Sequence, residues 1–82
     1  ISRFLGIIIF MNFNEHNPPH FHAKYGEYQV IIQILSGVVE GKFPKRALKL
    51  VMEWYEMHKS ELLDNWNTMK ETGEYKKISP LE

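Results

Sequence analysis

The hydrophobic pattern of the chain changes at Pro44, from spacing typical of β-strands to spacing typical of a helix. Before Pro44, short stretches either alternate between apolar and polar residues or run continuously apolar, which predicts strands. The expected strands cover residues 3–13, 20–25, 28–35 and 38–43. Gly26-Glu27 and Ser36-Gly37 are short enough for tight turns, so we predict an antiparallel meander of three to four strands.

After Pro44, apolar residues recur at steps of three and four, which predicts an amphipathic helix over residues 44–72. Pro44 suits the first turn of a helix, and Gly73 suits its end. An unbroken helix would be about 43 Å long. A helix pair divided near Lys59-Ser60, with Ser60 capping the second helix, is therefore an alternative.

Strands followed by helix give an α+β fold. We expect the 82 residues to form a single domain, with strands over about 3–43, helical structure over 44–72 and a tail over 73–82. Within the tail, the β-like residues 75–78 can add to a sheet edge. So small a chain has little core to spare, so a homo-oligomer is possible.

The segment HNPPHFHA, residues 16–23, contains three of the four histidines of the chain. His20 and His22 are two residues apart on a predicted strand, so their side chains share a face. The two prolines stiffen the preceding loop, and from that loop His16 can fold back over the pair.

Acid–base catalysis is one chemical interpretation, because histidine exchanges protons near neutral pH. His16, His20 and His22 would then transfer protons, while a basic residue held a phosphate. The candidate phosphate-binding residues are Arg3, Lys24, Lys45 and Arg46. The segment offers no serine or cysteine nucleophile, which argues against acyl transfer.

Metal binding is a second interpretation. His16, His20 and His22 can bind zinc or another transition metal, with Glu15 or His58 completing the site. The chain has no cysteine and no HExxH motif, so the strong zinc signatures are absent. We therefore predict no resident cofactor, with zinc as the alternative.

A purely structural interpretation remains. The prolines and asparagines would form a rigid turn, and the histidines would lie half-exposed on the polar face of an antiparallel sheet. On the helix, Trp54 and Trp66 have core spacing, whereas Tyr55 is predicted to be free to stack on a base.

Charge is unevenly placed, although the net charge is zero. Residues 1–49 carry six basic and three acidic residues, a balance of +3, and residues 50–82 carry four and seven, a balance of −3. Nonspecific nucleic-acid binders are usually basic throughout, so this charge distribution argues against that class of protein. It allows a local basic patch, such as residues 42–49. The apolar run 5–11 is too short to span a bilayer, so we expect a cytoplasmic protein without membrane contact.

Four stretches resemble a known family of small bacterial proteins. They are ISRFLGIIIFM, NEHNPPHFHAKYGEY, FPKRALKLVMEWYEMHKSELLDNW and KKISPLE, and together they resemble domain of unknown function family 4160. Members of that family usually begin with Met and Pro before the Ile-Ser-Arg-Phe stretch, so we expect the natural N-terminus to precede Ile1. The resemblance implies a partner, a second small protein encoded next door, in an arrangement similar to toxin–antitoxin pairs. It assigns no catalytic residue.

Our leading hypothesis is therefore one component of a toxin–antitoxin-like module, acting through protein contact and with RNA as a candidate target. As the active half, it would use the three histidines of the segment with Arg3, Lys24 and Arg46. Whether the chain is an enzyme stays open. The alternatives are a non-enzymatic adaptor and a small metal-binding domain.

Overall fold

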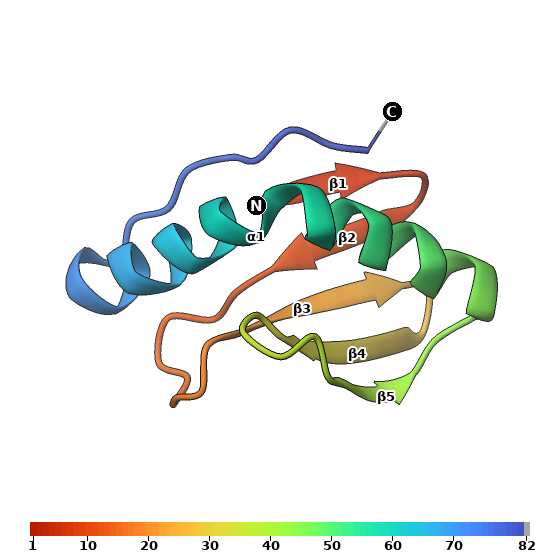
Figure 1. Ribbon diagram of the computed structural model, residues 1–82, viewed down its shortest axis with the longest axis horizontal. Helices are drawn as coiled ribbons and strands as arrows, with labels where there is room; N and C mark the ends of the chain where they lie inside the picture. The colour runs from red at the N-terminus through yellow and green to blue at the C-terminus, as the bar shows by residue number, and fades with distance from the viewer. Residues whose placement is uncertain (82) are drawn as a thin grey trace.

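The computed structural model describes residues 1–81 as one antiparallel sheet followed by one helix (Figure 1). The strands and the helix are β1 Ser2–Phe4, β2 Ile7–Phe10, β3 His20–Tyr25, β4 Tyr28–Gln33, β5 Val39–Lys42 and α1 Lys45–Thr72. The strands lie in the sheet in sequence order, and each pairs antiparallel with the next. The predicted α+β meander is thus confirmed, with five strands in place of three to four.

The extra strand arises from a tight hairpin inside the first apolar run. Leu5 has φ 50° and Gly6 has φ 81°, and Phe4 pairs with Ile7 on either side of them. Two consecutive positive φ values give a turn whose twist matches that of the strands it joins. The prediction of one strand over residues 3–13 is wrong, because Gly6 lets the chain reverse within the run.

The helix α1 is a single element with a kink. His58 has non-helical φ and ψ of −125° and 22°, one residue before the predicted break at Lys59-Ser60. Gly73 ends the helix in the left-handed conformation, as predicted, and its N–H donates to the Met69 carbonyl at 3.0 Å.

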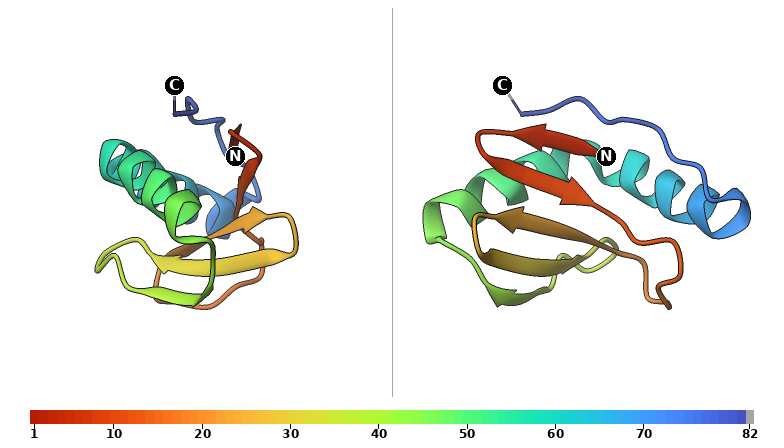
Figure 2. Two further views of the ribbon diagram at one scale, coloured as in Figure 1. Left: turned by 90° about the vertical axis from the view of Figure 1, so that its right-hand side faces the viewer. Right: turned by 180° about the vertical axis from the view of Figure 1, so that it is seen from behind.

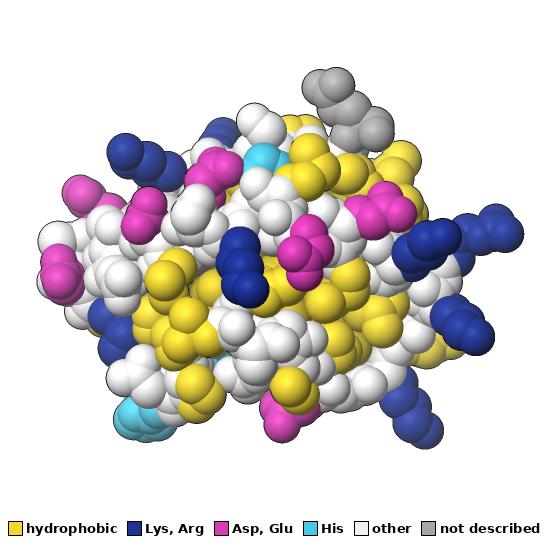
Figure 3. Space-filling view, in the orientation of Figure 1, with side chains coloured by type: hydrophobic (Ala, Val, Ile, Leu, Met, Phe, Trp, Pro, Cys, Tyr) yellow, Lys and Arg dark blue, Asp and Glu magenta, His cyan; other side chains and the backbone are white. Residues whose placement is uncertain are grey.

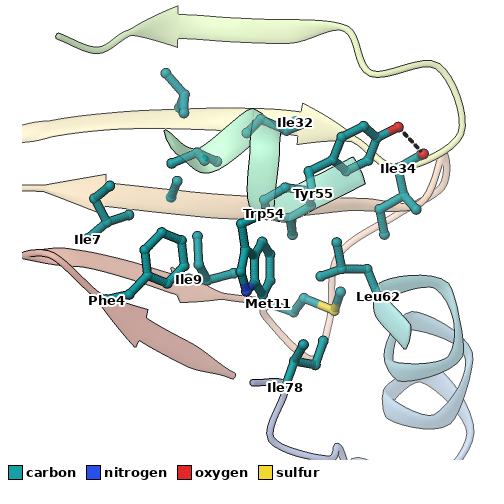
Figure 4. Close-up of a cluster of buried hydrophobic side chains, with 14 of the residues drawn as sticks. Phe4, Ile7, Ile9, Met11, Ile32, Ile34, Trp54, Tyr55, Leu62 and Ile78 are labelled. Carbon is teal, nitrogen blue, oxygen red and sulfur yellow. Dashed lines mark hydrogen bonds between the residues drawn. The ribbon is translucent and has the colours of Figure 1, made fainter. Parts of the chain in front are cut away.

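The core lies between α1 and the sheet, and Trp54 is at its centre (Figure 4). The Trp54 ring packs against Phe4 and Phe21, with ring centres 5.6 and 6.0 Å away. Trp54 and Trp66 are both buried, as their spacing predicts. Tyr55 is only 1% exposed and donates its hydroxyl hydrogen to the Ile34 carbonyl at 2.6 Å. The prediction of a free Tyr55 is therefore wrong, because the residue turns its ring into the core.

The tail returns along α1 toward β1 (Figures 1 and 2). The Asn65 side chain accepts a hydrogen bond from the Lys76 N–H at 2.8 Å and donates one to the Lys76 carbonyl at 2.9 Å. The Ile78 N–H donates to the Ile1 carbonyl at 3.1 Å, but residues 73–81 form no strand. The tail is thus held beside the sheet without extending it.

The sheet has one covered and one uncovered face (Figure 2). Phe21 and Ala23 of β3 are buried toward the middle of α1, and among residues 1–81 no helix or strand covers the opposite side except near His20, where Trp66 of α1 packs against the ring. Alternation along β3 places His20, His22 and Lys24 on that opposite side, which we call the open face. Within residues 1–81, no helix is long and apolar enough to cross a membrane.

Candidate functional site

Two histidines of the open face meet one carboxylate. Glu15, on the loop before β3, places Oε2 at 2.8 Å from His20 Nε2, and its Oε1 contacts His22 Nε2. His20 is 8% exposed and His22 is 5% exposed. The prediction of half-exposed histidines is wrong, because the loop between β2 and β3 brings Glu15 across both rings. We call Glu15, His20 and His22 the Glu-His-His cluster.

Neighbouring groups fix the orientation of both rings. His20 Nδ1 donates to the Pro18 carbonyl at 2.8 Å, and the His20 ring packs 5.0 Å from the Trp66 ring. His22 stacks on Phe10, its cross-strand partner, with ring centres 4.8 Å apart and planes 9° apart. The two Nε2 atoms are therefore held in place by packing and not only by Glu15.

The C-terminal half of α1 holds the loop that carries Glu15. Lys70 Nζ donates to the Glu15 carbonyl at 2.8 Å, and Trp66 Nε1 donates to Asn17 Oδ1 at 3.3 Å. These contacts join positions about fifty residues apart in the chain. The cluster is thus a product of the folded molecule, although its three members lie within eight residues of one another.

The cluster keeps Glu15 ionised. Burial raises the pKa of Glu15, but the hydrogen bonds and charges of His20 and His22 outweigh that effect and hold the pKa below its ordinary value. At neutral pH the site therefore contains a carboxylate that lies within hydrogen-bonding distance of two imidazole rings.

Three basic residues form a row beside the cluster. Across the sheet, Arg3 pairs with Ile8, Ile8 with Lys24, Lys24 with Gln29, and Gln29 with Lys42. Arg3, Lys24 and Lys42 are exposed, and since they lie on alternate strands the backbone of each is about 9.6 Å from that of the next. Lys24 follows His22 by two positions, about 6.8 Å along the strand. We call these three residues the basic row.

The other predicted site residues lie outside the cluster. His16 is exposed on the loop. Glu15 lies beside His20 and His22, where His16 was predicted to lie. His58 pairs with Glu61 at 2.6 Å, so of the two candidate completing residues only Glu15 joins the histidines. Lys45 and Arg46 are exposed in the first turn of α1, in the layer on the other side of the sheet.

Two glutamines near the cluster, Gln29 and Gln33, were not predicted as site residues. Gln29 Nε2 lies 3.5 Å from His22 Nδ1, and Gln33 pairs with His20 across β3 and β4. Gln33 Oε1 is buried and makes no hydrogen bond within the described residues 1–81. Alternation along β4 shows from the sequence that both glutamines share a face of that strand. Only the pairing of β4 with β3 places this face beside the histidines.

Comparison with known proteins identifies the family. A family model described as "Domain of unknown function (DUF4160)" matches residues 6–67, most of the chain. The chain belongs to this family. No curated protein and no solved structure matches it. Within this DUF4160 member, the matched region includes the whole Glu-His-His cluster, together with Lys24 and Lys42 of the basic row.

Proposed function

We propose that this DUF4160 protein cleaves RNA on the open face of its sheet, as the active component of a two-protein bacterial module in the cytoplasm. One observation carries the proposal. The Glu-His-His cluster and the basic row lie on the same face, one two-residue step apart along β3. Proton-transfer groups and phosphate-binding groups are thus adjacent.

The chemistry of RNA cleavage requires both kinds of group. When the ribose 2′-oxygen attacks the neighbouring phosphorus, a new O–P bond forms and the P–O5′ bond breaks. A base must take the proton of the 2′-hydroxyl, and an acid must give a proton to the departing O5′. A carboxylate and two imidazoles are groups of the required type, and Lys24 supplies positive charge to the phosphate oxygens.

Charge complementarity favours a polyanion over a neutral ligand. The row across five strands contains three cations and no acid, and its side chains are exposed to solvent. Glu40 is the acidic residue of β5 and lies two positions from Lys42, so it faces the same side at the far edge. An extended strand of RNA can follow the row while presenting one phosphate to the cluster.

We propose that the second protein of the module binds this chain on the side opposite the open face. Leu35 and Met57 are 61% and 66% exposed, and they line a shallow groove together with Leu63. Figure 3 shows hydrophobic side chains gathered on the face that carries α1. A partner seated there would leave the open face free for RNA, and co-expression with the neighbouring protein should give a stable complex.

A cleavage assay with labelled single-stranded RNA tests the proposal. We expect the purified chain to cut the RNA, and His20→Ala and His22→Ala each to lower the rate at least about a hundredfold. Lys24→Ala should weaken RNA binding with less effect on the rate at saturation. Lys49→Ala removes the same charge from an exposed position of α1 and should leave both quantities unchanged.

Two results would contradict the proposal. RNA cleavage that survives in both histidine variants would mean that the activity is not in the cluster or is a contaminant. Failure of the wild-type chain to bind or cut RNA, with an intact complex with the neighbouring protein, would instead favour the adaptor hypothesis. Circular dichroism of each variant checks that the fold is retained.

A further inference from the structure

The Glu-His-His cluster also has the composition of a metal site. One ring nitrogen of His20, one of His22 and one Glu15 carboxylate oxygen lie within 4.8 Å of one another, so a single ion can reach all three residues. Among the described residues 1–81, this is the one group of three such side chains. The predicted metal site was His16, His20 and His22, with Glu15 or His58 completing it. In the structure Glu15, and not His16, lies beside His20 and His22, so the donor set is two nitrogens and one carboxylate.

Hydrogen bonding around His20 leaves a place for a cation. A carbonyl oxygen only accepts hydrogen bonds, so the 2.8 Å contact with Pro18 requires a proton on His20 Nδ1. In the neutral ring, Nε2 then has a lone pair, and at 2.8 Å it faces the Glu15 carboxylate, which is another acceptor. Either a second proton or a metal ion must lie between these two groups.

The surroundings of the rings match those of metal-bound histidines. Imidazole ligands usually bind the ion through one nitrogen and donate the other N–H to a carbonyl, as His20 does to Pro18. His22 Nδ1 lies 3.5 Å from the Gln29 side-chain amide, which presents an acceptor oxygen when it is turned over. Gln33, opposite His20, adds a buried oxygen without a partner.

We propose that the Glu-His-His cluster binds one divalent transition-metal ion of the zinc class through His20 Nε2, His22 Nε2 and the Glu15 carboxylate. Two imidazoles and one carboxylate are the ligands of many zinc sites that keep an open position for substrate. Magnesium and calcium are disfavoured because they prefer oxygen ligands. The ion would supply the positive charge that balances the Glu15 carboxylate.

A catalytic role of the ion rests on the proposed function. Metal binding by the cluster does not, and it can be tested separately. With the ion bound, His20 and His22 would be ligands and no longer free to transfer protons, and the ion would supply the positive charge that a phosphate oxygen needs. Proton transfer by free imidazoles and metal-assisted cleavage therefore predict opposite effects of a chelator on RNA cleavage.

Metal titration of the full chain tests the proposal. The chelator-treated protein should bind one equivalent of Zn²⁺ in a calorimetric titration, and its melting temperature should rise. His20→Ala, His22→Ala and Glu15→Gln should each weaken the affinity about tenfold or more. His16→Ala and His58→Ala are matched controls, since each removes a histidine outside the cluster, and both should bind as wild type does.

Nuclear magnetic resonance of the wild-type chain tests the same proposal without relying on variants. Zn²⁺ should shift the ring nitrogen signals of His20 and His22 and leave those of His16 and His58 in place. Absence of binding, or binding that depends on His16, would overturn the proposed site. Zinc binding without RNA cleavage would refute the proposed function alone, and cleavage that persists in chelator would refute a catalytic role of the ion alone.

Discussion

At the scale of single residues, Glu15 and not the third histidine of the segment completes the cluster. Three histidines within seven positions suggest a cluster of imidazoles, but the loop turns Glu15 inward and His16 outward. Residue types and spacing predicted the pair His20 and His22, because strand alternation fixes a shared face. Which loop residue reaches them depends on contacts with Trp66 and Lys70, which no local pattern encodes.

The lowered pKa of Glu15 predicts how stability changes with pH. A carboxyl whose folded pKa lies below its unfolded value contributes stability above the unfolded value, and this contribution is lost as the pH falls through the folded pKa. We expect Glu15→Gln to cost about 1–3 kcal/mol of unfolding free energy at pH 7. The difference from wild type should shrink as the pH falls below about 4.5.

Urea unfolding of both proteins from pH 7 to pH 3 measures this difference. Glu27→Gln, at an exposed turn, corrects for the general effect of removing one negative charge. A difference between Glu15→Gln and wild type that stays constant over this range would show that the carboxylate does not bind the two rings in solution.

At the scale of elements, the hydrophobic pattern correctly predicted that strands precede a helix. It predicted less well where each strand begins and ends. The spacing of apolar residues changes at Pro44, and this change separates the sheet from α1. Side chains that share a face recur every two residues in a strand but about every 3.6 residues in a helix. Gly6 was missed as a turn since a continuous apolar run hides a reversal made by backbone conformation alone. Tyr55 was misplaced because its neighbour Trp54 occupies the predicted stripe, and the helix buries both.

Gly41 provides a test of the register between β4 and β5, on which the basic row depends. A Cβ at Gly41 would lie 2.7 Å from the Gln29 carbonyl oxygen, whereas a Cβ at Gly26 would meet nothing within 4 Å. Both glycines have positive φ, so each alanine variant carries backbone strain, but only Gly41→Ala adds a steric clash. We expect Gly41→Ala to be less stable than Gly26→Ala by about 1–3 kcal/mol in chemical unfolding. Equal stabilities would mean that β5 does not pair in this register.

At the scale of the whole molecule, the fold separates two surfaces. The sheet exposes basic and polar chemistry on one side, and α1 with the loop after β4 exposes apolar side chains on the other. The zero net charge therefore conceals a local cationic row that only strand register assembles. Residue types predicted Arg3 and Lys24 as phosphate contacts together with Lys45 and Arg46, but the structure places Lys45 and Arg46 in the other layer, at the start of α1.

RNA binding to the basic row should depend on salt. Each phosphate contact with a single strand contributes about 0.7 to the slope of log K against log salt concentration, because counterions are released. Lys24→Ala should therefore lower the slope by about 0.7. Fluorescence anisotropy at several salt concentrations measures the slope, and Lys49→Ala is the charge-matched control. An equal loss of slope in both variants would indicate diffuse attraction to the whole chain.

RNA is proposed to bind the protein at the open face, where the Glu-His-His cluster lies. Titration of the isotope-labelled full chain with a short oligouridine, followed by nuclear magnetic resonance, tests it most directly. We predict that the signals of His22, Lys24 and their neighbours on β2 and β4 shift, while those of residues 45–49 at the start of α1 do not. Shifts confined to residues 45–49, or no shift at all, would contradict the account.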